Sequence, residues 1–194
     1  MTATLPASAT RTVACACGTV TFTLAGAPFL VAECMCSSCR AAGEILEALP
    51  GAPPLLDAKD ATLTAMYRKD RLACTAGSEM LREFRLRPES PTRRIVAACC
   101  NSAMLLDFTK GHWIDVYGAR WPEAERPAPE MRTMTGDLAD AADLPGDIPN
   151  HRSHSLRFFA RLLGAWVAMR FRVPELSFVH GNLDPAADAV SPAP

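Results

Sequence analysis

Three cysteines stand within six positions of the segment CMCSSCR, at Cys34, Cys36 and Cys39. The two residues between Cys36 and Cys39 allow a tight turn that points both sulfurs at one ion. Cys34, at the end of an expected strand, projects to the same side as Cys36. Three thiolates can then converge on one Zn²⁺. Because no fourth Cys or His lies nearby in the sequence, the spacing favours a site with one free coordination position, unless a distant residue folds in to fill it.

Disulfides, a redox pair and an iron–sulfur cluster are the competing interpretations of these thiols. The N-terminus MTATLPASATRTVACACG has no basic start followed by a long apolar run. We therefore predict no signal peptide and a cytoplasmic protein, whose thiols stay reduced. A redox C-x-x-C is expected in a βαβ context, which this segment lacks. Iron–sulfur clusters usually take four cysteines from a longer pattern, so zinc is favoured.

Residues 11–120 are rich in expected strands. In VTFTL, the side chains of Val20, Phe22 and Leu24 fall on one face, which is the period of a half-buried strand. Short polar or Gly-containing turns separate the further strand segments FLVAEC, EMLREFRL, RRIVAACC, AMLLDF and HWIDVY. This spacing predicts an all-β sheet or sandwich. The prolines of residues 50–60 predict a loop.

The remainder of the chain divides into three parts. Residues 121–150 are rich in proline and acidic residues and are predicted to be a connecting or covering loop. Residues 151–175 hold the one strong helical pattern, and residues 176–194 form a tail predicted to be partly disordered. The apolar face of the predicted helix consists of Leu156, Phe159, Leu162, Leu163, Trp166 and Met169.

This helix is expected to cover the sheet or to contact a second copy in a homodimer. Its apolar run is short of the ~20 residues needed to span a bilayer. A basic polar face leaves membrane contact through residues 156–171 as an alternative. The chain of 194 residues has a formal net charge of −1, so no bulk attraction to nucleic acid is expected.

The segments CACGTVTF, CMCSSCRAAG and RRIVAACCNSAML resemble the glutathione-dependent formaldehyde-activating enzyme family, also called centromere-protein-V-like. The family pattern is C-x-C-G-x-V-x-F, then C-H-C-x-x-C-R-x-x-x-G, then a strand ending in C-x-x-C-G-x-x-L. The resemblance covers roughly residues 11–110 and implies a mainly β fold, a β-tent of antiparallel sheets with two zinc sites. It implies a structural zinc at Cys15, Cys17 and two late cysteines, and a reactive zinc at Cys34, Cys36 and Cys39.

The chain departs from the family pattern in two places. Met35 replaces a His that is not a ligand. In the late motif Cys100 takes the place of the second cysteine and Asn101 that of the glycine, while Ala97 stands where the first cysteine is expected. Cys99 is the substitute, although neighbouring strand residues face opposite sides, so Cys99 and Cys100 can both bind only if the backbone bends. Other candidates for this fourth ligand are Cys74 and His112.

By resemblance, the reactive site makes or breaks hemithioacetal adducts between a thiol and an aldehyde, glutathione and formaldehyde in the family name. A metal bound by three thiolates is a poor Lewis acid but holds an incoming thiol as thiolate. An anionic thiol needs a nearby cation, and Arg40 is the first candidate, before Arg93 and Arg94. Glu33 is a candidate general base, or else an ordinary strand residue that faces solvent.

Two functions therefore compete. The first is a zinc enzyme of the carbon–sulfur lyase type that acts on small thiols and aldehydes. The second is a non-catalytic binding module in which zinc serves folding alone. The number of protein ligands at each metal distinguishes the two, because an enzyme needs an exchangeable position.

Overall fold

Strands dominate the computed structural model, which describes residues 9–185. The strands are β1 (Thr10–Ala14), β2 (Thr21–Ala25), β3 (Leu30–Cys34), β4 (Thr62–Arg68), β5 (Leu72–Ala76), β6 (Leu81–Phe84), β7 (Thr92–Ala97), β8 (Ser102–Phe108), β9 (Trp113–Tyr117) and β10 (Met131–Thr133). The two α-helices are α1 (Ser37–Glu47) and α2 (Leu156–Ala168). Short 3₁₀ turns include η3 (Gly118–Arg120), η4 (Glu123–Glu125) and η5 (Thr135–Asp137).

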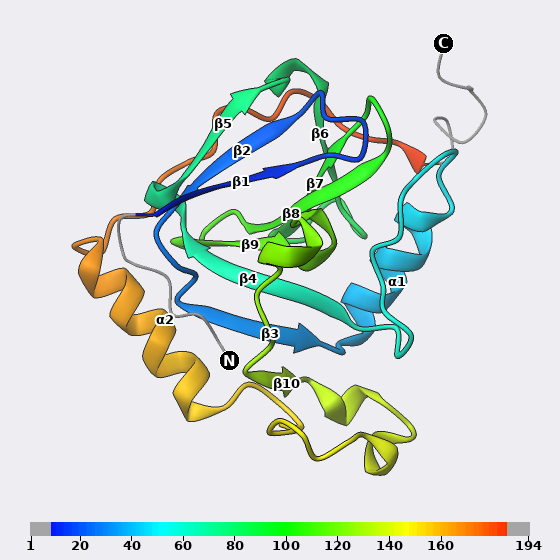
Figure 1. The fold of residues 1–194 in the computed structure, drawn as a ribbon, viewed down its shortest axis with the longest axis vertical. Coiled ribbons are helices and arrows are strands. Elements are labelled where there is room, and N and C mark those ends of the chain that lie inside the picture. The colour runs from blue at the N-terminus through cyan, green and yellow to red at the C-terminus, as the bar shows by residue number, and fades with distance from the viewer. Residues whose placement is uncertain (1–8, 186–194) are drawn as a thin grey trace.

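The strands form two sheets that pack face to face. The small sheet has the order β1-β2-β5 and the large sheet the order β10-β3-β4-β9-β8-β7-β6. Every pairing is antiparallel except that of β10 with β3. Phe22 and Leu24 of the small sheet pack with Tyr67, Ile114 and Val116 of the large sheet in the main core. Figure 1 shows β5, β2 and β1 on one side of the fold and β3 and β10 on the other.

Both helices cover the outer face of the large sheet, at its two ends (Figure 1). Leu46 of α1 packs with Leu106 and Tyr117. Phe158 and Leu162 of α2 pack with Leu30, Ala32, Met66 and Met131. The middle of this outer face remains uncovered by either helix, and it carries the cavity described below.

Helix α1 begins inside the CMCSSCR segment and was not predicted from the sequence. Its buried residues Cys39, Ala42, Gly43 and Leu46 follow the i, i+3, i+4, i+7 period of an amphipathic helix. Gly43 lowers helix propensity but is required by packing, since a Cβ there would lie 2.5 Å from Leu56. Tertiary contact therefore overrides local propensity in this helix.

The prediction of a mainly β protein with a C-terminal helix is confirmed. Within 121–150, the residues of β10 add a buried strand to the large sheet, so this stretch is more than a connection. The segment 176–185 lies partly along β6, where His180 donates its backbone N–H to Leu81 and Leu183 to Glu83. The predicted disorder of the last residues, 186–194, lies outside the described residues. Among the helices of the described chain, none has the length and apolar character to cross a membrane.

Candidate metal centres and the adjoining cavity

Four cysteines from two distant turns converge at one end of the molecule. The four-cysteine cluster consists of Cys15, Cys17, Cys99 and Cys100, whose sulfurs all lie within 4.8 Å of one another. Cys17 Sγ lies 3.5 Å from Cys15 Sγ and 3.4 Å from Cys99 Sγ. A tetrahedral zinc with bonds of about 2.3 Å separates its sulfurs by about 3.8 Å. The donor set and its spacing therefore fit a closed metal site, consistent with zinc.

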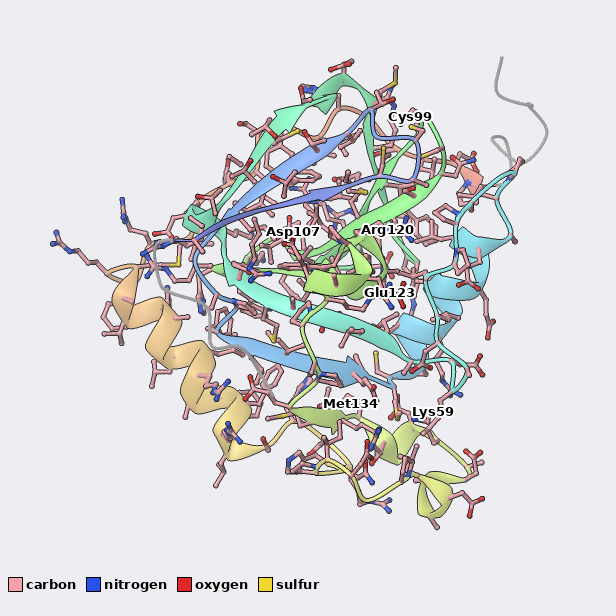
Figure 2. The ribbon with its side chains drawn as sticks, in the orientation of Figure 1. Lys59, Cys99, Asp107, Arg120, Glu123 and Met134 are labelled. Carbon is pink, nitrogen blue, oxygen red and sulfur yellow. The ribbon has the colours of Figure 1, made fainter. Side chains whose placement is uncertain are left out.

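A bend of the backbone resolves the conflict between adjacent Cys99 and Cys100. β7 ends at Ala97, and the Cys100 N–H donates to the Ala97 carbonyl at 3.3 Å across a turn. Asn101 closes this turn with a positive φ of 51°, a conformation that Gly and Asn tolerate best. Asn is thus a workable substitute for the glycine of the family pattern. Both cysteines face the cluster, and Figure 2 shows Cys99 at the end of the molecule far from Met134.

The sulfurs of the four-cysteine cluster are electrostatically unequal. Hydrogen bonding with Thr19 lowers the pKa of Cys17 to about 6, whereas burial raises the pKa of Cys15. Arg120 donates to Ser102 Oγ at 3.3 Å, and this hydroxyl lies 3.1 Å from Cys100 Sγ. The guanidinium therefore places positive charge beside thiolates that would carry negative charge when bound to a metal.

The three-cysteine cluster, Cys34, Cys36 and Cys39, is built from the end of β3 and the start of α1. Cys36 is the N-cap of α1, and its sulfur accepts the Cys39 N–H at 3.3 Å. Hydrogen bonds with Cys34 and Cys39 lower the pKa of Cys36 to about 2. Hydrogen bonding with Cys36 and burial raise the pKa of Cys34. Without a cation one thiol therefore ionises at the expense of its neighbours, and a metal dication would hold all three as thiolates.

No fourth Cys, His, Asp or Glu joins this cluster within the residues that the structure describes. Instead, the three cysteines lie in the wall of a cavity of about 700 Å³ on the outer face of the large sheet, here called the cysteine cavity. α1 and α2 flank it, and its apolar lining includes Phe108, Trp113 and Phe158. A ligand of drug size or smaller fits such a volume.

Strand register explains which polar residues reach the cysteine cavity. Across the large sheet, Met66 of β4 pairs with Asp115 of β9, Asp115 with Leu106 of β8, and Leu106 with Arg94 of β7. Paired residues share a face, and all four line the cavity together with Cys34. The carboxyl group of Asp115 and the guanidinium group of Arg94 therefore face the same cavity as the three cysteines.

Arg94 and Asp115 have unusual environments. Arg94 is only 2% exposed and donates to the Ser38 carbonyl at 3.1 Å, within the first turn of α1. Hydrogen bonding with Cys34 and, to a smaller extent, the positive charge of Arg94 lower the pKa of Cys39, but hydrogen bonding with Cys36 and burial raise it more, so this pKa is raised overall. Burial, and secondarily the charge of Asp107, raises the pKa of Asp115 to about 7, and Asp115 Oδ1 has no hydrogen-bond partner. Asp115 was missed in the sequence, although an acid between Trp113 and Tyr117 on one strand face was an available signal.

The raised pKa of Asp115 predicts a pH-dependent cost to stability. The folded state keeps the proton up to about pH 7, whereas the unfolded chain releases it near 3.8, so stability falls as pH rises between these values. At about 1.4 kcal/mol per pKa unit, the largest loss in the free energy of unfolding is about 4 kcal/mol, and access of water to the cavity makes the loss smaller. Urea unfolding should show Asp115→Asn more stable than wild type at pH 8 and equal to it at pH 4. Asp140→Asn, the same change at an exposed site, should match wild type at both pH values, and a gain for Asp115→Asn at pH 4 alone would contradict the account.

Three residues that were candidates for the reactive site do not line the cysteine cavity. Arg40 does not line the cysteine cavity but donates to the Asp137 carbonyl at 3.2 Å, so its role in binding stays a prediction. Glu33 projects to the other face of β3 and pairs with Arg132 at 2.7 Å. Arg93 pairs with Glu83 and Asp107 rather than with the cysteines.

The alternative ligands of the four-cysteine cluster are also placed apart from it. Cys74 donates to the Ala76 carbonyl at 3.4 Å. The Nε2 atom of His112 lies 2.9 Å from the Leu162 carbonyl oxygen, and its ring stacks on Trp166. Cys99, and neither Cys74 nor His112, therefore completes the four-cysteine cluster.

The fold and the two clusters define a mainly β protein with two cysteine sites able to hold metal ions. Residues 10–48 match the family model described as glutathione-dependent formaldehyde-activating enzyme, which confirms the resemblance over both early cysteine motifs. No curated protein matches the chain. A solved structure of a Rhodobacter sphaeroides protein is similar at 15% identity and a TM-score of 0.42, covering 72% of this chain and 99% of that one.

Proposed function

We propose that this protein is a zinc-dependent carbon–sulfur lyase that makes and breaks adducts of a small thiol and an aldehyde. The observation that carries the proposal is that the three-cysteine cluster has no fourth ligand among the described residues and lies in the wall of the cysteine cavity. The match to the glutathione-dependent formaldehyde-activating enzyme family suggests glutathione and formaldehyde as the reactants. A cytoplasmic location, where cysteines stay reduced, is part of the proposal.

The residues present fit a zinc ion at each cluster. At the four-cysteine cluster the ion would serve folding, since all of its ligand positions are filled by protein sulfur. At the three-cysteine cluster a bound zinc would supply one free position that holds the sulfur of an incoming thiol as thiolate. The cavity around this position has an apolar lining that includes Phe108 and Phe158.

Asp115 is the proposed proton acceptor. When a hemithioacetal breaks, the proton of its hydroxyl passes to the Asp115 carboxylate, the C–S bond breaks, and an aldehyde and a thiolate result. In the reverse direction the thiolate attacks the carbonyl carbon and the Asp115 carboxyl returns the proton to the developing alkoxide. A pKa of about 7 suits both directions near neutral pH.

Arg94 and Arg87 are the arginines that line the cysteine cavity. Arg94 is buried beside the cysteines and offsets the net negative charge of a zinc bound by three thiolates. Arg87 is exposed at the rim and is placed to attract a carboxylate of an anionic thiol. We therefore expect anionic thiols to be preferred over cationic ones of similar size.

Exchange of formaldehyde with its thiol adduct, followed by NMR with the zinc-loaded protein, tests the proposal. Glutathione should be processed faster than cysteamine, and Asp115→Asn should lower the rate by about 100-fold without changing the zinc content. Asp140→Asn should leave the rate unchanged. If zinc fills both sites and no thiol is accelerated, the protein is instead the non-catalytic zinc-stabilised module.

A further inference from the structure

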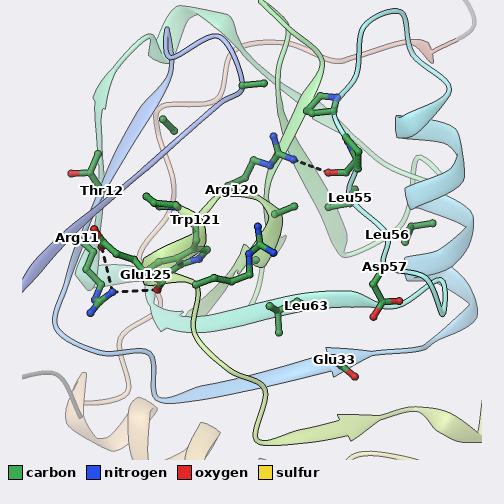
Figure 3. A pocket seen from close by; sticks show the side chains of 18 of the residues that line it. Arg11, Thr12, Glu33, Leu55, Leu56, Asp57, Leu63, Arg120, Trp121 and Glu125 are labelled. Carbon is green, nitrogen blue, oxygen red and sulfur yellow. Dashed lines mark hydrogen bonds and ion pairs between the residues drawn. The ribbon is translucent and has the colours of Figure 1, made fainter. Parts of the chain in front are cut away.

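A second cavity lies on the other face of the large sheet. This arginine cavity, of about 1140 Å³, is lined by residues of β1, the loop 53–57, η3 and η4 (Figure 3). Glu33 and Leu63 line it, whereas the next residues, Cys34 and Thr64, line the cysteine cavity. Successive strand residues face opposite sides, so the sheet separates the two cavities. The arginine cavity therefore takes no part in the chemistry proposed above.

Three buried N–H donors in its wall have no hydrogen-bond partner within residues 9–185: Arg11 Nε, Arg120 Nε and Trp121 Nε1. Arg11 is 9% exposed, Arg120 7% and Trp121 4%. Arg11 also lies over the indole of Trp121, with 5.6 Å between its Cζ and the ring centroid. Buried donors are nearly always paired in folded proteins, so the neighbouring donors of Arg11 and Trp121 point to an acceptor that enters from outside.

The charges of this wall favour a singly charged anion. Arg120 donates to the neutral oxygens of Ser102 and Pro54, at 3.3 and 2.8 Å. Arg11 meets Glu125 at a long 3.5 Å, and the Glu125 side chain is 52% exposed (Figure 3). The exposed Arg126 also lines the cavity. Glu125 would repel a phosphate dianion more strongly than a carboxylate, whose single charge can accept from both Arg11 and Trp121.

We propose that the arginine cavity binds a small organic carboxylate with an apolar body. The carboxylate accepts from Arg11 and Trp121, which lie together, and the body lies against the apolar lining of the cavity. This site does not depend on the proposed lyase activity, so either proposal can fail without the other.

NMR of the indole N–H groups in the zinc-loaded full chain tests this site. The chain has three tryptophans, and Trp121→Phe assigns the resonance of interest. Titration with benzoate should shift the Trp121 resonance saturably and leave Trp113 and Trp166 unchanged. Neutral benzamide should have no effect, and phosphate should bind more weakly than benzoate. Equal shifts at all three indoles, or none with benzoate, would show that only water fills the cavity.

Two variants make the test specific. Glu125→Gln removes the competing carboxylate from an exposed side chain and should tighten benzoate binding several-fold. Arg11→Gln, once circular dichroism shows it folded, should weaken binding by about 10-fold or more. Arg71→Gln removes an exposed arginine that does not line the cavity and should leave binding unchanged. Unaltered affinity in both Glu125→Gln and Arg11→Gln would overturn the proposal.

The outward face of α2 carries a second, independent inference. Leu156 is 89% exposed, and Phe159, Leu163 and Val167 are each more than half exposed, while Phe158 and Leu162 face the sheet. Helix α2 thus has apolar residues on two faces, and only one is covered by described residues. Residues 151–174 contain five arginines and no acidic residue.

We infer that this face lies on an anionic membrane surface. Glu130 pairs with Arg157 and Arg161, but no carboxylate pairs with Arg152, Arg170 or Arg172 in the described part of the chain. An exposed apolar stripe beside unpaired arginines fits the boundary of an anionic bilayer, where the stripe enters the acyl region and the cations meet headgroups.

Co-sedimentation with vesicles tests this surface. The zinc-loaded protein should pellet with vesicles that contain phosphatidylserine and stay in solution with pure phosphatidylcholine. Leu163→Glu should abolish pelleting because it places a charge in the exposed apolar stripe. The fold should stay intact because the Leu163 side chain is exposed. Arg71→Gln should pellet like wild type. If no vesicle is bound and light scattering shows a dimer that Leu163→Glu dissociates, a second copy covers this face and the membrane inference is wrong.

Discussion

Cys36→Ser is expected to remain folded, to lose one of two bound zinc ions, and to lose at least about 1,000-fold of the thiol–aldehyde exchange rate. Loss of an outer-shell partner alone typically costs 10- to 100-fold at a metal site, so loss of a ligand should cost more. Serine does not ionise at neutral pH and cannot replace the thiolate. Two cysteines, Cys34 and Cys39, are too few protein ligands to retain zinc.

The fold should survive this substitution because serine is a good N-cap. Cys36 caps α1 by accepting the Cys39 N–H, and a serine hydroxyl can accept the same hydrogen bond. The matched control is Cys74→Ser, a cysteine outside both clusters, which should keep two zinc ions and full activity. Zinc counting and exchange NMR on the same samples measure both effects. Full activity in Cys36→Ser would show that the chemistry lies elsewhere.

Cys17→Ser is expected to have the opposite profile, with its main effect on folding. The four-cysteine cluster joins the turn between β1 and β2 to the turn between β7 and β8, which ties Cys17 to Cys99 across 82 residues of sequence. Zinc binding in small metal-stabilised domains contributes about 10–16 kcal/mol. The whole stability of a typical domain is about 5–15 kcal/mol. Loss of one ligand should therefore lower the free energy of unfolding by about 5 kcal/mol or more.

Urea unfolding followed by circular dichroism, with zinc measured in each sample, checks this expectation. A chelator should destabilise the wild type by a similar amount and should have little further effect on Cys17→Ser. Cys74→Ser again serves as the control and should change the free energy of unfolding by about 1 kcal/mol or less. If Cys17→Ser is as stable as wild type, the four-cysteine cluster is not a structural metal site.

Local spacing was sufficient to predict the cysteines but not their surroundings. The C-x-C-x-x-C pattern identified Cys34, Cys36 and Cys39 as a cluster because a turn and a strand end fix their directions. Whether Cys99 and Cys100 could act together depended on a turn closed by Asn101, whose positive φ no periodicity reveals. The resemblance to the family predicted their partners, Cys15 and Cys17, before the backbone explained how.

The polar groups of the cysteine cavity depend on sheet register, which the sequence does not fix. Arg94 and Asp115 reach the cavity because β7, β8 and β9 pair in one register, and a slip of one residue would turn them to the opposite face. Arg40 was favoured because it follows the cysteines in sequence, but its position on helix α1 directs its side chain away from the cavity. β10 was missed because three residues are too few to show a strand period.

Zinc X-ray absorption spectroscopy tests the central claim most directly. With two zinc ions per chain, one bound by four sulfurs and one by three, the average should be about 3.5 sulfurs per zinc and the remaining ligand a light atom. Addition of glutathione should raise the average to about 4 in wild type, as its sulfur takes the free position. An average of 4 before any thiol is added, or one that glutathione leaves unchanged, would contradict the proposed reactive site.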